Sequence, residues 1–307
     1  FETNLGAMSD SGAKAYLRPE TAQSIFINFK NVLSSTRVKM PFGIGQIGKA
    51  FRNEITPRQF LFRVREFEQM ELEFFCKADQ SAAYFETWLD RQRQFYKGLG
   101  LREEHIRFRA HEKDELAHYS TCCTDVEYLF PFGWKELEGI AHRGNYDLRR
   151  HSEFSGKDLS VFEQDTNSSY LPDVVECSVG VGRLFFALLC DAYHEDEVEG
   201  ETRVVLKLRP HLAPVNVAVL PLTKKQTEAT QHTLAILRKA GLRVQFDESG
   251  SIGKRYRRQD EIGTPLCITY DYDSDVDHCV TIRNRDTLQQ IRTPISTVAL
   301  TVQRLLG

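Results

Sequence analysis

Segment 51–75 places charged side chains where a β-sheet usually buries apolar ones. From Arg63 the chain alternates, which predicts a strand whose one face carries Arg63, Arg65, Phe67, Gln69, Glu71 and Glu73 and whose other face carries Val64, Met70, Leu72 and Phe74. Arg52 and Glu54 lie two apart on the expected incoming strand, which a short turn joins to the second. Guanidinium groups, carboxylates and an aromatic ring on one surface suit a nucleotide and a small zwitterion. An exposed sheet with cross-strand ion pairs explains the same pattern and stays open.

Segment 174–189 is a second candidate for ligand binding. It reads as a strand, a turn containing Gly180 and Gly182, and an apolar helix with Arg183 in its first turns. A helix start offers unpaired N–H groups to a phosphate, and glycine lets a ligand approach the backbone closely. A structural glycine turn before a buried helix is the alternative.

The elements that must position these segments are helices and strands in the first two thirds of the chain. Helices are expected within 15–30 and over 81–99, the latter with a buried stripe of Tyr84, Phe85, Trp88, Leu89 and Phe95. Alternation predicts a strand over 125–132, continued over 139–147, and the polar stretch 151–170 is expected to be an exposed excursion. His111, His118 and His142 are in no metal or triad motif and are expected to be surface or structural residues.

After a connection over 197–213, strands and helices alternate. Strands are expected at 216–222, 243–246, 266–270 and 280–283, and helices at 224–239 and 296–306, which predicts a small α/β domain. Within it, segment 253–258 groups four cations around Tyr256, as either an RNA contact or a solvated basic turn.

Composition favours a globular protein of two domains. The chain has 307 residues, 41% hydrophobic and 27% charged, with a formal net charge of -3, which argues against a protein that coats nucleic acid. We expect no membrane segment or export signal, because no apolar run approaches 18 residues. The seven cysteines form no C-x-x-C pair, so a reducing, cytoplasmic location is expected.

Several segments together resemble the class II aminoacyl-tRNA synthetases of the glycyl type. Segment 51–75 is similar to their motif 2, and 174–183 to their motif 3, with Cys177 in place of the usual proline. The resemblance covers nearly the whole chain. It implies an α+β catalytic domain, an antiparallel sheet flanked by helices, over 1–211, and an α/β anticodon-binding domain over 212–307. The opening at Phe1 suggests a partial chain that lacks motif 1.

The resemblance also implies a function and a set of site residues. The expected reaction is ATP-dependent activation of glycine and its transfer to tRNA-Gly by a homodimer, with magnesium held by Glu136. Arg52, on the α-phosphate, and Arg183, on the γ-phosphate, are the expected catalytic residues. The full set for ATP is Arg52, Asn53, Glu54, Phe62, Arg63, Val64, Arg65, Glu66, Phe67, Glu136, Leu137, Gly180, Val181, Gly182 and Arg183.

For glycine, the resemblance places Glu20, Glu71 and Glu176 around the ammonium group, with Ser178 beside them, and Arg143 is the candidate for the carboxylate. The expected set is Glu20, Phe67, Glu68, Gln69, Met70, Glu71, Arg143, Glu176, Cys177, Ser178, Val179 and Gly180. Three carboxylates around one cavity should raise at least one pKa. The expected tRNA contacts are Lys254, Arg255, Tyr256, Arg257 and Arg258.

Two other functions stay open. One is a synthetase-like protein without catalysis, such as an accessory or regulatory subunit, because fold does not secure function. Retention of Arg52, Arg183 and the glutamates favours the enzyme, because buried charges without a ligand are costly. The other is a synthetase for serine, proline or threonine.

Overall fold

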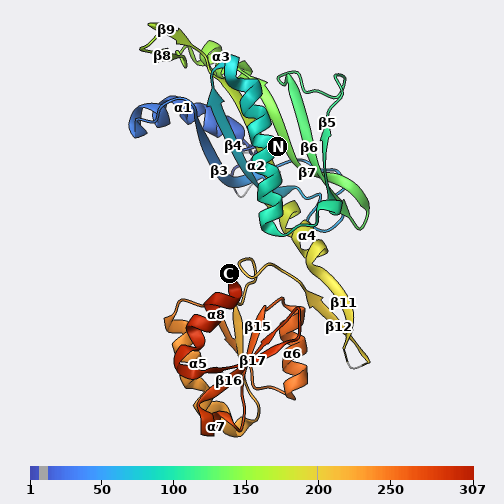
Figure 1. The fold of residues 1–307 in the computed structure, drawn as a ribbon. Helices are drawn as coiled ribbons and strands as arrows, with labels where there is room; N and C mark the ends of the chain where they lie inside the picture. The colour runs from blue at the N-terminus through green and yellow to red at the C-terminus, as the bar shows by residue number, and fades with distance from the viewer. Residues whose placement is uncertain (7–12, 199) are drawn as a thin grey trace. The chain divides into compact units, whose positions relative to one another are not determined.

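A computed structural model describes residues 1–6, 13–198 and 200–307. Its contacts divide the chain into two compact units, Phe1–Ala187 and Leu188–Gly307 (Figure 1). Within the part of the chain so described, no helix combines the length and the apolar character needed to cross a membrane.

The first unit is built on a six-stranded antiparallel sheet. Its strands run in the order β3 (Phe42–Phe51), β4 (Glu66–Cys76), β10 (Asp173–Gly180), β7 (Gly133–Gly144), β6 (Cys122–Phe130) and β5 (Ile106–Ala110). Two hairpins accompany it, β1 (Glu2–Asn4) with β2 (Lys14–Tyr16) and β8 (Val161–Glu163) with β9 (Ser168–Tyr170).

Three helices pack against this sheet. α2 (Ser81–Leu99) lies along one face, where Tyr84 and Trp88 contact Phe74 with ring centroids 4.9 and 5.5 Å apart (Figure 1). α1 (Ala22–Thr36) and α3 (Tyr146–Ser155) share a core cluster with β4 and β10 that includes Phe26, Phe29 and Phe75. α4 (Val181–Ala192) starts directly where β10 ends, as the sequence predicted. Short 3-10 helices span Ala78–Gln80 and Glu103–His105.

The second unit is an α/β domain. Its sheet has the order β14 (Val244–Phe246), β13 (Val217–Pro221), β15 (Leu266–Tyr270), β16 (Cys279–Asn284) and β17 (Gln290–Pro294), and the first three strands are parallel. α5 (Thr227–Lys239) and α8 (Val298–Leu306) cover one face and α6 (Ile252–Glu261) the other (Figure 1). Val217 and Val219 therefore meet one core cluster and Ala218 and Leu220 the other. The unit also contains the hairpin β11 (Tyr193–Val198) with β12 (Glu201–Leu206), α7 (Ser274–Asp277), and 3-10 helices at Lys224–Gln226 and Ile295–Thr297.

The predicted charged hairpin is wrong in its bounds. β3 ends at Phe51 and β4 begins at Glu66, so Arg63 and Arg65 lie in the loop 52–65 rather than on a strand. Pro57 interrupts pairing there, and Gln59 and Phe60 take positive φ values of 59° and 52°, which form a tight turn closed by an isolated bridge between Arg58 and Arg63.

Other expectations fail where tertiary packing outweighs local composition. The polar stretch 151–170 continues α3 and forms the β8–β9 hairpin, with Leu159 and Val161 buried. In α2, Tyr96 rather than Phe95 completes the buried stripe. The connection 197–213 contains β12, β17 was not predicted, and 253–258 is part of helix α6 rather than a turn.

Candidate functional site

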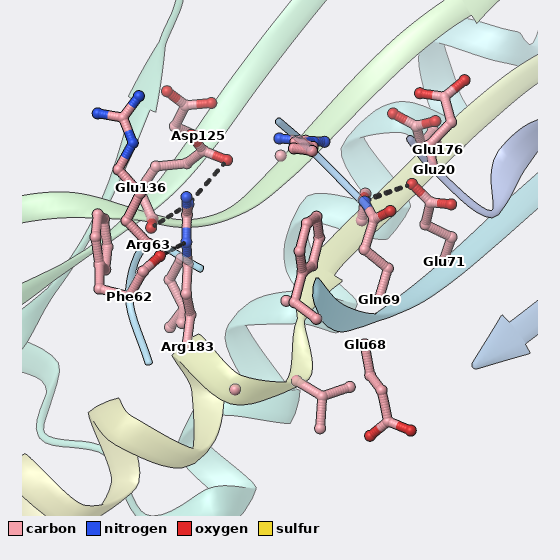
Figure 2. A pocket seen from close by; sticks show the side chains of 18 of the residues that line it. Glu20, Phe62, Arg63, Glu68, Gln69, Glu71, Asp125, Glu136, Glu176 and Arg183 are labelled. Atoms are coloured by element: carbon pink, nitrogen blue, oxygen red, sulfur yellow. Dashed lines mark hydrogen bonds and ion pairs between the residues drawn. The ribbon is translucent and has the colours of Figure 1, made fainter. Parts of the chain in front are cut away.

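One large cavity opens over the sheet of the first unit. It has a volume of about 660 Å³ and is bounded by the loop 52–65, strands β4, β6, β7 and β10, and the start of α4. Figure 2 shows Phe62, Glu136 and Arg183 gathered at one side and Glu20, Glu71 and Glu176 at the other. Arg183 and the three carboxylates of Glu20, Glu71 and Glu176 therefore lie at different sides of a single pocket, and one further carboxylate, that of Glu136, lies beside Arg183.

The polar face of β4 is more buried than its apolar face. Gln69, Glu71 and Glu73 are 5%, 3% and 0% exposed, whereas Met70 and Leu72 are only partly buried. Glu71 stands opposite Ser178 on β10, and it is held on both carboxylate oxygens. The Thr21 backbone N–H and the Thr21 hydroxyl donate to Oε2, the former at 2.8 Å, while Ser178 Oγ and Gln69 Nε2 donate to Oε1 at 2.8 and 3.0 Å. Glu71 is thus a fixed acceptor in the pocket wall.

Glu176 is held by Arg143, which is buried and is not among the residues that line the pocket. Arg143 Nη1 donates to Glu176 Oε2 at 2.7 Å, and Nε and Nη2 donate to Asp147 at 2.8 and 2.9 Å. Burial raises the pKa of Glu176 and the Glu71 carboxylate adds to the rise, while Arg143 opposes it. Burial, with Glu176 as the next cause, raises the pKa of Glu73 well above its usual range. A carboxyl pKa therefore rises as expected, but burial is a larger cause of the rise than repulsion between the carboxylates.

Arg183 anchors the basic side of the cavity. Its Nε donates to the carbonyl of Phe62 and its Nη1 to the carbonyl of Glu136, both at 3.1 Å, and its guanidinium lies 4.3 Å from the centroid of the Phe62 ring. Burial lowers the pKa of Arg183, and the carboxylate of Glu136, 3.6 Å from Nη1, opposes this only in part. The guanidinium therefore lacks enough negative charge nearby to balance its own. Such a group favours an anionic ligand.

The loop 52–65 supplies two more cations. Arg63 pairs with Glu54 at 2.7 Å, and the Arg52 guanidinium lies 5.3 Å from the centroid of the Phe67 ring. All four side chains line the cavity. The structure thus brings the predicted motif 2 residues together, although only Phe67 lies on its expected strand and Arg52, Glu54 and Arg63 lie in the loop.

The strand-to-helix junction presents two glycines to the cavity. A Cβ on Gly180 would meet only the Arg183 side chain, at 3.7 Å or more, and one on Gly182 would meet Leu61 at 3.7 Å. These are ordinary contacts, and neither glycine has a positive φ. Protein packing therefore does not require glycine here, whereas close approach of a ligand does.

Most of the predicted site residues line the cavity. Those that do are Glu20, Arg52, Glu54, Phe62, Arg63, Val64, Glu66, Phe67, Glu68, Gln69, Glu71, Glu136, Leu137, Glu176, Ser178, Gly180, Val181, Gly182 and Arg183. Asn53 and Arg65 are not among the lining residues, and the Arg65 Nε donates to the Glu54 carbonyl instead.

Four residues predicted to bind glycine are placed elsewhere. Met70, Cys177 and Val179 project to the opposite face of the sheet and line a separate groove beside α2, because alternate residues of a strand face opposite ways. Arg143 is 3% exposed and is outside the lining set, so its guanidinium is used by Asp147 and Glu176 rather than offered to a ligand.

Residues from the end of β5 to β6 were missed by sequence reasoning, although they line the cavity. His111, Tyr119, Cys123 and Asp125 line it, and His111 was expected to be outside any site. The alternation of Cys123 and Asp125 on the predicted strand was an available signal, but it needed the pairing of β5 with β6 to bring His111 alongside. The further residues that were missed are Leu61, Glu115, Ala117, Ser120, Gly139, Ala141 and Phe185.

The five predicted tRNA contacts lie on α6 in the second unit, and not all are available. Arg255 is 3% exposed and donates to the carbonyls of Pro221 and Gly250. The Tyr256 hydroxyl hydrogen-bonds Thr269 Oγ1 at 2.5 Å, and its ring lies 4.7 Å from the Arg283 guanidinium, so both the hydroxyl and the ring have partners within this unit. Arg258 pairs with Asp247 at 2.6 Å, Arg257 is 28% exposed, and Lys254 is exposed.

Comparison with known proteins assigns the second unit first. The family model described as "Anticodon binding domain" matches residues 216–305. Among solved structures, prolyl-tRNA synthetase from Cryptosporidium parvum, complexed with L-proline and AMP, matches with a TM-score of 0.72 over 99% of this chain and 64% of that one. Its sequence identity is 18%, so this similarity establishes the fold, and the predicted class II synthetase fold is confirmed.

Sequence relatives are much closer. Glycine--tRNA ligase of Caldanaerobacter subterraneus subsp. tengcongensis is 58% identical over 298 residues, which cover 97% of this chain and 64% of the relative. Glycine--tRNA ligase of Acetivibrio thermocellus is 55% identical over 96% of this chain and 64% of its own length. The chain thus spans about 64% of the length of these curated relatives. Over nearly all of its own length the chain is similar to the glycine–tRNA ligases, and it has the fold of the class II aminoacyl-tRNA synthetases.

Proposed function

We propose that the protein containing this chain is a glycine–tRNA ligase, which activates glycine with ATP and transfers it to tRNA-Gly. The observation that carries the proposal is the division of charge inside one cavity: Arg63 and Arg183 lie at one side, and Glu20, Glu71 and Glu176 lie at the other. Phosphates suit the first side and an ammonium group suits the second. The relatives named glycine--tRNA ligase support the choice of amino acid.

ATP would occupy the basic side. Arg52 is proposed to bind the α-phosphate, Arg183 the γ-phosphate, and Glu54 the adenine amino group, with Phe67 stacked on the ring. Arg183 is suited to this role because backbone carbonyls of Phe62 and Glu136 hold it in place before a ligand arrives. Gly180 and Gly182 leave room for the nucleotide beside it.

Magnesium is proposed to join the ATP through Glu136. The carboxylate of Glu136 is 55% exposed, and a single accessible carboxylate fits a Mg²⁺ ion whose other ligands are phosphate oxygens and water. When bound, the ion neutralises charge on the phosphates. Residues at this side then orient the triphosphate for in-line attack.

Glycine would occupy the acidic side with its ammonium group near Glu20, Glu71 and Glu176. Because Glu71 is already saturated by four donors, it shapes the wall, and Glu20 and Glu176 are the carboxylates with capacity left for the ammonium. A bound ammonium group would favour the ionised form of Glu176 and so oppose the rise in its pKa that burial causes. Rigid walls exclude larger amino acids by overlap, whereas a loose pocket would discriminate one methyl by about 1–3 kcal/mol.

In the first step a glycine carboxylate oxygen forms a bond to the α-phosphorus of ATP, and the bond to the bridging oxygen breaks, which releases pyrophosphate. In the second step a terminal ribose hydroxyl of tRNA attacks the glycyl carbonyl and loses its proton, and AMP leaves. The chain's own residues position reactants and stabilise charge, and no covalent intermediate on the protein is needed.

The remaining parts of the proposal concern partners and setting. We propose a catalytic domain over 1–211 and an anticodon-binding domain over 212–307, with Lys254, Arg257 and Arg258 as the available contacts for tRNA. A homodimer and a cytoplasmic location complete the proposal.

The test is amino-acid-dependent exchange of pyrophosphate into ATP by the full-length protein, with glycine, alanine, serine, proline and threonine assayed separately. We expect exchange with glycine alone. Exchange with another of these amino acids would overturn the assignment of substrate, and a folded protein that binds ATP but exchanges with none would be the non-catalytic relative. Arg183→Ala should reduce exchange by 100-fold or more, on the order of 3 kcal/mol.

A matched control distinguishes the loss of an arginine charge in general from the loss of the proposed ATP contact at Arg183. Arg150 is 40% exposed and pairs with Glu153 on α3, outside the cavity. Arg150→Ala should therefore exchange at the wild-type rate. If Arg150→Ala and Arg183→Ala lost activity equally, the placement of ATP at Arg183 would be wrong.

A further inference from the structure

Three side chains with metal-ligating atoms meet at the wall of the cavity that β6 and the residue after β5 form. His111 follows β5, and its backbone N–H donates to the Cys123 carbonyl at 2.9 Å, which extends the ladder between β5 and β6 by one residue. Cys123 and Asp125 are two apart on β6 and share one face. All three line the cavity, so the ladder directs them to the same side.

The donor atoms converge without making hydrogen bonds to one another. The atoms of His111, Cys123 and Asp125 all lie within 4.8 Å of each other. His111 Nε2 is 2.8 Å from Asp125 Oδ2, yet within the described ranges both ring nitrogens are buried and lack a hydrogen bond of acceptable geometry. A buried imidazole beside a carboxylate, but not hydrogen-bonded to it, is arranged as two ligands of a common ion are.

The donor set selects the type of ion. Imidazole nitrogen, thiolate sulfur and carboxylate oxygen together suit Zn²⁺ and similar transition-metal ions, whereas Mg²⁺ prefers oxygen alone. Donor atoms around tetrahedral zinc lie about 3.2–3.8 Å apart, so small side-chain movements complete the geometry. A thiolate and a carboxylate balance the two charges of the ion, and the thiol proton of Cys123 leaves to solvent when the metal–sulfur bond forms.

The nearest competing cation has another partner. Arg109 Nη2 lies 3.1 Å from Asp125 Oδ2, the oxygen that also faces His111. Arg109 Nη1 is held by both oxygens of Glu115 at 3.0 and 2.9 Å, and its side chain is 37% exposed. Glu115 can therefore retain Arg109 while Asp125 binds a metal. In the part of the chain that the structure covers, no other group of three such side chains was found.

We propose that His111, Cys123 and Asp125 bind one Zn²⁺ ion, with a fourth coordination position open to the cavity. The site is separate from the magnesium proposed at Glu136, because it uses a different donor set on a different strand. It does not depend on the proposed ligase activity, and the test below measures binding alone.

The test uses the full-length protein, freed of metal with a chelator and then titrated with Co²⁺ as a spectroscopic substitute. We expect one Co²⁺ per chain with an intense thiolate-to-cobalt charge-transfer band, and loss of that band when one equivalent of Zn²⁺ is added. Cys123→Ser keeps the side-chain volume but removes the soft donor, and it should abolish the band and weaken Zn²⁺ binding by at least about 10-fold.

Cys122→Ser is the matched control, because Cys122 is the adjacent cysteine and faces the other side of β6. It should keep the band and the affinity of the wild type. Circular dichroism establishes that both variants fold, and Asp125→Asn gives an independent loss if Cys123→Ser does not. Absence of the band in the wild type, or equal Zn²⁺ affinity in Cys123→Ser and Cys122→Ser, would overturn the proposal.

Discussion

Arg143 Nη1 donates a hydrogen bond to Glu176 Oε2 at 2.7 Å, and the two side chains are 3% and 10% exposed. The same guanidinium donates two further hydrogen bonds to Asp147, so one cation pairs with two buried carboxylates. Arg143 is thus a positioning residue, and Glu176 depends on it for orientation.

Replacing Arg143 by alanine should leave Glu176 and Asp147 buried and unpaired. We expect a loss of about 3–5 kcal/mol in the free energy of unfolding, measured by urea denaturation. Arg143→Lys keeps one charge but loses the planar fork, so it should unfold less easily than Arg143→Ala while raising the KM for glycine more than the KM for ATP. Equal changes in both KM values would argue against a role through Glu176.

Glu71→Gln tests the wall on which the glycine pocket is built. An amide offers one acceptor oxygen, whereas Glu71 accepts from Thr21, Ser178 and Gln69 on both oxygens. The amide nitrogen would face donors, which costs about 1–3 kcal/mol of stability. In the exchange assay the KM for glycine should rise more than the KM for ATP, and an unchanged KM for glycine would remove Glu71 from this role. Glu86→Gln, on the exposed side of α2, is the control and should change neither value.

Gly180→Ala separates a requirement of the fold from a requirement of the ligand. Because a Cβ at this position makes only ordinary contacts, the free energy of unfolding should change by less than about 1 kcal/mol. The added methyl projects into the cavity, so the KM for ATP should increase several-fold. Gly98→Ala, in open space on α2, should be neutral or slightly stabilising and fully active. Strong unfolding of Gly180→Ala would show that packing, not ligand approach, selects glycine.

The spacing of apolar residues and the positions of glycine and proline were enough to place several helices and strands from the sequence. α2 and β15 have the predicted bounds, and the junction of β10 with α4 puts Arg183 in the first helical turn. The bounds of these elements were predicted correctly because the signals are local: a helical stripe of apolar residues, a run of buried strand residues, and glycines at a strand-to-helix junction.

The errors arise where partners distant in the sequence decide the outcome. Alternation assigned Glu71 and Glu73 to one face of β4, but only the sheet order showed that this face is the more buried one. Arg143 looked like a ligand for a carboxylate, yet Asp147 and Glu176 bind it inside the protein. For the same reason a basic run predicted five tRNA contacts, although Arg255 caps carbonyls within its own domain.

Glu138 should make stability depend on pH between about 4.5 and 7. Burial raises the pKa of its carboxyl from 4.5 to about 7, although the Tyr96 hydroxyl, which donates to it at 2.6 Å, opposes the rise. The folded state therefore holds a proton that the unfolded state releases. This contribution to the free energy of unfolding is fully present below the unfolded pKa and is lost as pH rises through 7, by up to about 3 kcal/mol.

The Glu138→Gln variant tests this dependence, because its side chain cannot ionise and still accepts the hydrogen bond from the Tyr96 hydroxyl. Urea unfolding from pH 4.5 to 8 should show a smaller decline for Glu138→Gln than for the wild type, whereas Glu104→Gln, on an exposed side chain, should follow the wild type. Parallel curves for the wild type and Glu138→Gln would exclude Glu138 as the source of the dependence.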